Sequence, residues 1–326
     1  MKRVLITGGT GFVGANLVRR VLRDGHEVHL AVRRPHQAWR ISEVMSDVRL
    51  HETDMRDRES VRNVVEAVKP EWVFHLAAYG AYSNQTGIER MVATNILAST
   101  ALLDASAELG IEAFVQTGSS SEYGYKKHPA SEEEVIEPNS HYAITKAAAT
   151  HYCQFTARTA NIHAVTARLY SIYGPYEEPT RLIPTLIAHG LRGQLPPLVS
   201  PRTARDFVYV DDAVDAMLHI AARKSITRGR VYNICTGRQT TLDGVVQSAS
   251  RLLNITASPR WSTMPGRSWD TDIWVGSPAL LEREAGWSAK VDIEGGLKRT
   301  ADWLCDNPTW RRFYDTGIFG EMESKD

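Results

Sequence analysis

The sequence predicts an α/β fold in which a doubly wound parallel Rossmann sheet is joined to a smaller, mixed C-terminal unit. Short apolar runs alternate with helical patterns through the first half of the 326-residue chain, as expected for parallel strands buried on both faces. A glycine-rich turn connects the first of these runs to the first helix. Beyond Tyr173 the alternation breaks, and prolines between residues 175 and 201 mark an irregular region.

The expected elements follow in chain order. The first strand, residues 4–6, runs into the glycine turn, and a helix follows over 17–22. Further strands are predicted at 28–32, 48–51, 72–77, 114–117 and 164–169, and further helices at 61–68, 92–109 and 143–158. A strand and then a helix return over 207–222, with Asp211 and Asp212 as favourable charges in the first helical turn.

This order of elements predicts two units. Residues 1–173 with about 207–235 form the dinucleotide-binding unit, and residues 174–206 with about 236–326 form the smaller substrate unit. A second ligand is expected in the cleft between them.

The glycine turn predicts where a dinucleotide binds. Glycines let the backbone turn sharply and approach a pyrophosphate, and the N-terminus of the following helix offers unpaired N–H groups and a positive dipole end. The spacing is GxxGxxG, one residue longer than the GxGxxG fingerprint. The expected contacts in this turn are Gly8, Thr10, Gly11, Phe12, Val13 and Gly14.

Composition excludes several classes of protein. The chain has 38 basic and 38 acidic residues, which favours neither nucleic acid nor an anionic membrane as a partner. Its apolar runs fall short of the roughly 20 residues that span a bilayer. The three cysteines are widely spaced without a CxxC pair, as in proteins of a reducing compartment. We therefore expect a soluble cytoplasmic protein that binds neither nucleic acid nor metal.

A tyrosine and a lysine carry the candidate chemistry. Tyr142 and Lys146 are four residues apart at the start of a predicted helix, so both lie on one face. A phenol titrates near about 10 when unperturbed, and a nearby cation favours its ionised form. Hydroxyl side chains at 119–121 follow the strand at 114–117, at the sheet edge where ligands of open α/β folds bind. One of these serines is expected beside a substrate carbonyl.

Together these motifs resemble the extended short-chain dehydrogenase/reductase family, most closely its nucleotide-sugar epimerase, dehydratase and ketoreductase branch. The resemblance runs in order from residue 4 to about 237. It rests on Thr7–Gly14, His75–Ala78, Asn95, Ser119–Gly124, Tyr142–Lys146, Tyr173–Pro175 and Arg205–Asp212. The GxxGxxG spacing is the variant that this family uses.

The resemblance implies a catalytic set of Ser119, Tyr142 and Lys146. Tyr142 would be the general acid/base, and Lys146 would lower its pKa and bind the nicotinamide ribose. Asp54 matches the acid that contacts adenine, and Arg205 matches the arginine that binds the substrate's diphosphate. The further cofactor contacts expected are Met55, Leu76, Ala77, Ala78 and Asn95. The expected substrate contacts are Tyr79, Tyr82, Ser120, Ser121, Ser171, Arg205 and Arg267, the last replacing an arginine missing at Met264. Tyr79 and Tyr82 have packing as their alternative role.

The second strand indicates the type of cofactor. NAD-preferring folds end this strand with an acid, whereas this chain has Arg33 and Arg34 there. Arginine suits a 2′-phosphate by charge and geometry, so we expect NADP, with NAD as the alternative if both arginines are merely solvated. NADP favours a ketoreductase, because epimerases and dehydratases of this family usually recycle bound NAD.

The turn after the predicted catalytic serine bears on the reaction. Sugar 4,6-dehydratases of the family usually carry a glutamate two residues after the catalytic hydroxyl, where this chain has Ser121; Glu122 comes one residue later. The sequence therefore favours an NADP-dependent reductase of a nucleotide-diphosphate 4-keto-6-deoxy sugar. A nucleotide-sugar 4-epimerase with tightly bound cofactor is the alternative, followed by a 4,6-dehydratase and a catalytically inactive dinucleotide sensor.

The helices predicted over 92–109 and 143–158 are apolar on more than one face. In the resembling family such helices form a dimer bundle, so we expect a homodimer. Burial within the subunit is the alternative explanation.

Overall fold

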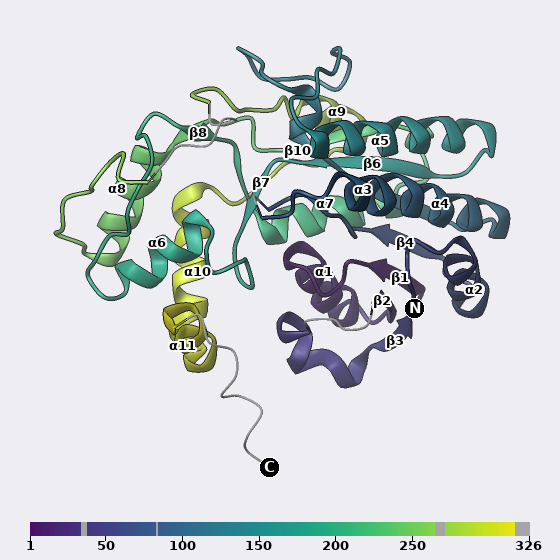
Figure 1. Cartoon of the computed structure of the whole chain (residues 1–326), viewed down its shortest axis with the longest axis horizontal. Helices are drawn as coiled ribbons and strands as arrows, with labels where there is room; N and C mark the ends of the chain where they lie inside the picture. The colour runs from purple at the N-terminus through teal and green to yellow at the C-terminus, as the bar shows by residue number, and fades with distance from the viewer. Residues whose placement is uncertain (34–37, 83, 265–270, 317–326) are drawn as a thin grey trace.

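The protein, a computed structural model described over residues 1–33, 38–82, 84–264 and 271–316, is built on a seven-stranded sheet. Its order is β10-β6-β5-β4-β1-β2-β3, and every neighbouring pair is parallel (Figure 1). The strands are β1 (Arg3–Thr7), β2 (Glu27–Val32), β3 (Arg49–Glu52), β4 (Trp72–His75), β5 (Ala113–Ser119), β6 (Ala164–Leu169) and β10 (Val231–Ile234). This confirms the predicted doubly wound α/β class.

Helices cover both faces of the sheet, each with its own hydrophobic core. On one face α1 (Phe12–Arg23) packs beside α7 (Val210–Ala222), and a helical segment (Trp39–Asp47) adjoins α1. On the other face α2 (Arg58–Val68), α4 (Ala98–Leu109) and α5 (His141–Thr159) lie side by side. Burial on both faces explains why the strand sequences are continuously apolar rather than alternating.

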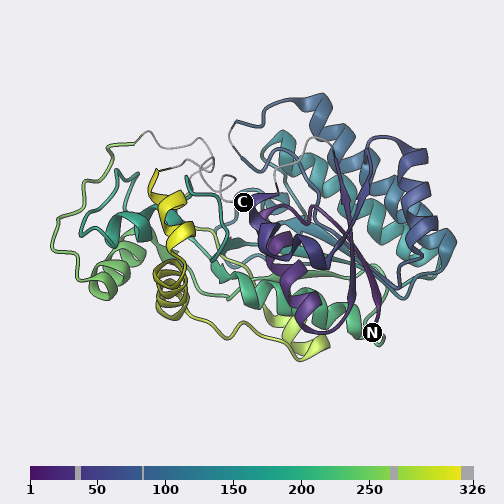
Figure 2. The ribbon, with the colours of Figure 1, turned by 90° about the horizontal axis from the view of Figure 1, so that it is seen from below.

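The smaller unit gathers four helices at one side of the sheet (Figures 1 and 2). These are α6 (Leu182–Gly190), α8 (Leu242–Leu253), α10 (Ile293–Asp306) and α11 (Pro308–Thr316). They share a third core, rich in aromatic side chains, to which Trp39 also contributes from the N-terminal half. Two short sheets connect the units: β7 (Ser171–Tyr173) pairs with β9 (Phe207–Tyr209), and β8 (Ala204–Arg205) pairs with β11 (Thr240–Thr241).

Several elements differ from the sequence-based expectation. The strand expected over 72–77 ends at His75, because residues 76 and 77 lie against the glycine turn. The helix expected over 92–109 begins earlier, at α3 (Ile88–Met91), and passes through a π-helical turn, Val92–Leu97. The proline-rich region contains α6, whose Pro184 lies in the first helical turn, where a missing N–H costs little.

Helix α9 (Ala279–Ala285) lies within the range expected for the smaller unit, yet it packs on β10 and contributes to the core of the large sheet. Its Leu280 and Leu281 are buried there, so the chain crosses back between the units after β10. Among the described helices, none has the length and apolar character needed to cross a membrane.

Candidate active site

The glycine turn joins β1 to α1 through close backbone contacts. Gly8 adopts φ +71°, and a Cβ on it would lie 2.6 Å from the Ala77 backbone nitrogen at the end of β4. A Cβ on Gly14 would lie 2.1 Å from the Gly8 carbonyl oxygen. Gly11 is the N-cap of α1, and among the described residues no side chain caps this helix. The first N–H groups of α1 are therefore suited to a pyrophosphate, which fits the expected dinucleotide.

A series of buried hydrogen bonds connects the start of the glycine turn to β4 and α4. Thr7 Oγ1 lies 2.6 Å from His75 Nδ1, and His75 Nε2 lies 2.8 Å from Ser99 Oγ. Burial lowers the pKa of His75 to about 3, so the ring is neutral at physiological pH. Thr7 Oγ1 also accepts a hydrogen bond from the Ala77 N–H. The glycine turn and the end of β4 are thus held together as one rigid edge.

Ser119 lies at the carboxyl end of β5, where it caps a short 3₁₀ turn formed by Ser120–Tyr123. Its Oγ lies 2.7 Å from Ser121 Oγ and accepts a hydrogen bond from the Ser121 N–H. Glu122 completes the capping box, because its Oε1 accepts the Ser119 N–H at 2.7 Å. The backbone of the predicted catalytic serine is therefore fixed by Glu122.

Glu122 faces the protein interior and not the cleft. Its side chain is fully buried, and its Oε2 lies 2.9 Å from Arg168 Nε on β6. The Arg168 guanidinium carbon in turn lies 4.5 Å from the centre of the Tyr123 ring. Because both carboxylate oxygens have partners, Glu122 does not supply the acid that is missing at Ser121.

Helix α5 presents Tyr142 and Lys146 to the same cleft as Ser119. Ser140 caps the helix by accepting the Ala143 N–H, so Tyr142 lies in the first turn. Lys146 lies one turn further and is only 2 % exposed. The structure thus brings the three predicted catalytic side chains together from two separate elements, β5 and α5.

The pKa values correct one expectation. Burial, together with the Glu122 charge, raises the pKa of Tyr142 to about 12, although a hydrogen bond with Ser119 opposes this shift. The pKa of this phenol is therefore raised by the protein, not lowered as the spacing from Lys146 had implied. Burial also lowers the pKa of Lys146 to about 8, against the attraction of Glu122. At pH 7 the resting site holds a protonated phenol beside an ammonium group.

A cleft of about 610 Å³ extends from the glycine turn past these residues to the smaller unit. Of the expected substrate contacts, Tyr82, Ser120, Ser121, Ser171 and Arg205 line it. The expected cofactor contacts that line it are Gly8, Gly11, Phe12, Val13, Gly14, Leu76, Ala78, Tyr142 and Lys146. Both halves of the predicted ligand set therefore open into one continuous space.

Other predicted residues lie outside the lining of this cleft. Tyr79 packs beneath Arg90, whose guanidinium carbon lies 4.4 Å from the ring centre. The Asn95 amide is 1 % exposed and bonds the Tyr79 N–H, the Tyr79 carbonyl and Thr145 Oγ1 at 2.8–2.9 Å. Asn95 therefore links the loop after β4 to α5, and its contact with the cofactor stays a prediction.

The remaining predicted contacts lie in several places, and two of the cofactor contacts, Arg33 and Asp54, lie just after β2 and β3. Arg33 is exposed just beyond β2, and Asp54 is bonded by the backbone and guanidinium of Arg56, which lowers the Asp54 pKa to about 2. Met55 is buried in the core. Thr10 lies in the glycine turn and Ala77 against Gly8, both partly exposed. Arg34 and Arg267 lie outside the described residues.

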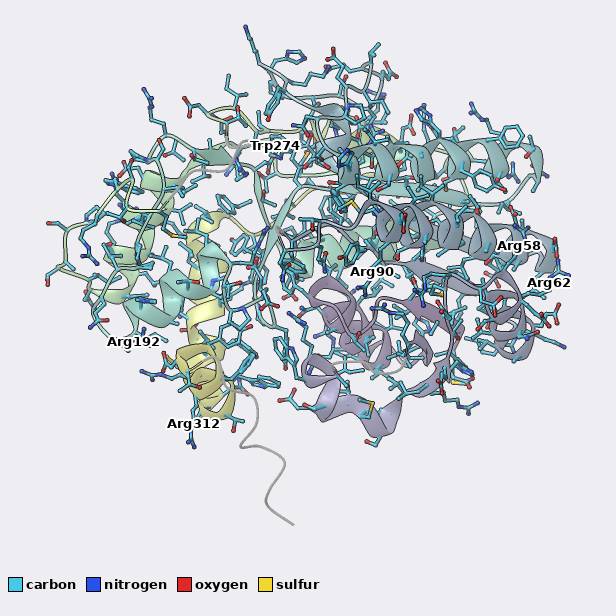
Figure 3. All side chains as sticks on the ribbon, viewed as in Figure 1. Arg58, Arg62, Arg90, Arg192, Trp274 and Arg312 are labelled. Atoms are coloured by element: carbon cyan, nitrogen blue, oxygen red, sulfur yellow. The ribbon has the colours of Figure 1, made fainter. Side chains whose placement is uncertain are left out.

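Sequence reasoning missed several residues of the cleft. Trp274 lies where the smaller unit meets the sheet (Figure 3) and lines the cleft. Its indole N–H donates a hydrogen bond to Ser120 Oγ at 3.0 Å. The Arg205 guanidinium carbon lies 5.7 Å from the centre of the Trp274 ring. Further lining residues that were not predicted include Gln85, Thr86, Asn139, His141, Glu177 and Arg181. Glu177 and Arg181 closely follow Tyr173–Pro175, a motif that could have directed attention to them.

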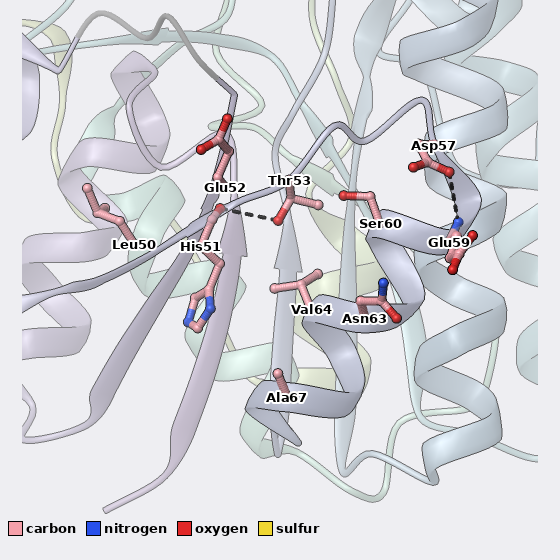
Figure 4. Close-up of a pocket in the computed structure, with 10 residues that line it drawn as sticks. All are labelled: Leu50, His51, Glu52, Thr53, Asp57, Glu59, Ser60, Asn63, Val64 and Ala67. Atoms are coloured by element: carbon pink, nitrogen blue, oxygen red, sulfur yellow. Dashed lines mark hydrogen bonds between the residues drawn. The ribbon is translucent and has the colours of Figure 1, made fainter.

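A second hollow of about 520 Å³ lies at the outer edge of the sheet, between β3 and the start of α2 (Figure 4). Its lining includes His51, Thr53, Asp57 and Asn63, and the Asp57 carboxylate accepts the Glu59 N–H as the cap of α2. None of the predicted catalytic or ligand-binding residues lines it. The candidate site is therefore the cleft.

Comparison with known proteins agrees with this geometry. The profile of the NAD dependent epimerase/dehydratase family matches residues 4–235. The dTDP-glucose 4,6-dehydratase of Neisseria meningitidis serogroup B is 26 % identical over 95 % of each chain. A solved UDP-glucose 4-epimerase with UDP-glucose, from Thermotoga maritima, is 26 % identical with a TM-score of 0.82, over 93 % of this chain and 98 % of that one. The Thermus thermophilus UDP-glucose 4-epimerase complex with NAD is 27 % identical with a TM-score of 0.76, over 92 % and 98 %.

Proposed function

The chain belongs to the NAD dependent epimerase/dehydratase family, whose members are enzymes of the extended short-chain dehydrogenase/reductase type, and we propose that it reduces a nucleotide-diphosphate 4-keto-6-deoxy sugar with NADPH. The observation that carries this proposal is Arg33, which is exposed at the end of β2, where a carboxylate would favour NADH. A ketoreductase consumes NADPH, whereas epimerases and dehydratases of this family usually recycle bound NAD. Tyr142, whose pKa burial raises to about 12, is protonated and can donate the proton that reduction needs.

The glycine turn and Lys146 line the part of the cleft that would hold NADPH, which when bound would supply the hydride for the sugar carbonyl carbon. Tyr142 donates its phenolic proton to the carbonyl oxygen, which becomes the hydroxyl oxygen of the product. Ser119, whose Oγ is oriented by Ser121, stabilises the negative charge that develops on this oxygen. The phenolate left on Tyr142 is then reprotonated from solvent, and the Lys146 ammonium stabilises it until that happens.

The turn after β5 argues against dehydration as the main activity. Water loss from the sugar needs a second acid/base near the reacting carbons. Ser121 occupies the position where the family's dehydratases usually carry glutamate, and Glu122 is committed to Arg168 and the Ser119 N–H. Arg205 lines the cleft and is suited to the substrate's diphosphate.

Arg33 supports NADPH over NADH. It lies exposed at the end of β2, where a carboxylate would favour an unmodified ribose. Replacing Arg33 with alanine should weaken NADPH binding about tenfold or more, because a charge-assisted contact to the 2′-phosphate is lost, and should leave NADH binding unchanged. Fluorescence titration of both cofactors measures this, and an equal loss for both would reject the 2′-phosphate role. The T. thermophilus neighbour was solved as a complex with NAD.

A 4-epimerase is the second candidate, because the two solved neighbours are named as UDP-glucose 4-epimerases. The reactions differ in their stoichiometry. A reductase consumes one NADPH for each sugar, whereas an epimerase interconverts intact nucleotide sugars without net consumption of cofactor.

The test is to incubate the purified protein with NADPH and dTDP-, UDP-, GDP- or CDP-4-keto-6-deoxyhexoses. The 340 nm absorbance and NMR spectra of the products report the reaction. Stoichiometric loss of NADPH, abolished by Tyr142→Phe, is the expected result. Turnover of intact nucleotide sugars with unchanged NADPH would reject reduction and establish epimerisation.

We also propose a homodimer formed through α4 and α5. The π turn that leads into α4 and helix α5 itself expose Leu97, Ile144 and Phe155, with Phe155 61 % exposed. Three large apolar side chains exposed on neighbouring helices are typical of a protein interface.

A further inference from the structure

The carboxyl group of Glu177 is buried without a hydrogen-bond partner for one of its oxygens. Glu177 follows β7 and precedes α6, and its residue is only 5 % exposed. Within the described chain Oε2 has no partner, while Oε1 lies 3.6 Å from Arg181 Nε, beyond hydrogen-bonding distance. Leaving such an oxygen unsatisfied is unfavourable, so beyond its ion pair with Arg181 this side chain adds little to local stability.

The backbone around Glu177 is firmly held. Its carbonyl accepts the hydroxyl of Tyr314 from α11, and its N–H contacts the Gly174 carbonyl at 3.3 Å. The preceding residue, Tyr176, adopts φ +68°, a conformation that costs a bulky side chain energy. Tyr176 is kept in this conformation by Arg40 Nε, which bonds its carbonyl at 2.8 Å. The position of Glu177 is thus imposed by several elements and not by its own side-chain contacts.

Glu177 lines the cleft next to the predicted sugar pocket, and it is the only acidic residue among the described residues that do so. Tyr82 and Arg181 line the same space, and burial raises the pKa of Tyr82. An unsatisfied buried carboxyl oxygen requires an explanation, and beside a ligand cleft a bound ligand can supply the missing partner.

We propose that Glu177 is a specificity-determining contact for a hydroxyl group of the sugar that binds in this cleft. This inference rests on the proposed function, because it assumes that the ligand is a nucleotide sugar. Burial raises the pKa of Glu177 to about 8, with Arg181 and Arg40 opposing it, so the group is mostly a neutral carboxylic acid at pH 7. A neutral carboxylic acid offers one donor and one acceptor, which matches a hydroxyl that needs both.

The experiment compares binding of a sugar with binding of its nucleotide alone. Calorimetric titrations of wild-type protein with UDP-glucose, dTDP-glucose, GDP-mannose and CDP-glucose identify the tightest nucleotide sugar, and the matching nucleoside diphosphate is titrated beside it. Glu177→Leu should weaken the nucleotide sugar about threefold to tenfold, the worth of one neutral hydrogen bond, and leave the nucleoside diphosphate unchanged. Glu177→Gln retains a donor and an acceptor and should restore most of the affinity.

Thermal unfolding provides a second readout. Leucine removes a buried, unsatisfied carboxyl group, so Glu177→Leu should unfold at the wild-type temperature or above. The matched control is Glu178→Gln, because the Glu178 carboxylate pairs with Arg40 and does not line the cleft. The Glu178→Gln variant should bind the nucleotide sugar and the nucleoside diphosphate with the same ratio of affinities as the wild type.

Three results would overturn the inference. They are wild-type sugar affinity in Glu177→Leu, an equal loss for the sugar and the diphosphate, and a lower unfolding temperature without selective loss of the sugar. If no nucleotide sugar binds the wild type, the proposed function is rejected and this inference with it. If the wild type binds a nucleotide sugar and the Glu177 variants bind it equally well, only this inference is rejected.

Discussion

Loss of one partner of the buried ion pair between Glu122 and Arg168 should destabilise the protein far more than loss of both. The Arg168 side chain is 3 % exposed and Glu122 is fully buried, with 2.9 Å between Nε and Oε2. At an effective dielectric constant near 20, two unit charges at this distance attract by about 6 kcal/mol, most of which offsets the cost of removing them from water. The net value of the intact pair is therefore small.

Removing one partner leaves the other buried without compensation. We expect Glu122→Gln and Arg168→Met each to lower the free energy of unfolding by about 3–5 kcal/mol, and the double variant to lose only about 1 kcal/mol. Methionine would fill the space against Tyr123, and glutamine would keep an acceptor for the Ser119 N–H. The double variant is thus predicted to be more stable than either single one.

Urea unfolding of the wild type and three variants, followed by circular dichroism at pH 7, completes this double-mutant cycle. Losses that simply add in the double variant would refute the argument. So would a loss below about 1 kcal/mol in both single variants.

Three further predictions concern the cofactor site and the proposed interface. Gly14→Ala should abolish NADPH binding, because its Cβ would lie 2.1 Å from the Gly8 carbonyl oxygen; a wild-type dissociation constant in a fluorescence titration would contradict this. NADPH affinity should fall as the pH rises through about 8, where Lys146 loses its proton, and Lys146→Met should remove this pH dependence. Phe155→Glu should yield a monomer in size-exclusion chromatography, whereas Val135→Glu, which alters an exposed residue outside α4 and α5, should not; a dimer in both variants would reject the interface.

The sequence alone determined the order of strands and helices along the chain and predicted where a dinucleotide would bind. Apolar runs indicate strands buried on both faces, and glycines at 8, 11 and 14 indicate a tight turn between the first strand and the first helix. The Tyr142–Lys146 pair was also recognisable, because a spacing of four residues on a helix is a local property. Local periodicity and local spacing are the information that a linear sequence carries directly.

The tertiary structure decided the electrostatics and the far wall of the cleft. Burial and Glu122 raise the pKa of Tyr142, although its neighbour in sequence, Lys146, had indicated the opposite shift. Desolvation depends on what packs around a group, so it cannot be derived from spacing. Trp274 reaches Ser120 across 154 residues of chain, and the unsatisfied oxygen of Glu177 becomes apparent only when its neighbours are placed around it. Contacts between residues distant in sequence, and the loss of water that they cause, exist only once the chain has folded.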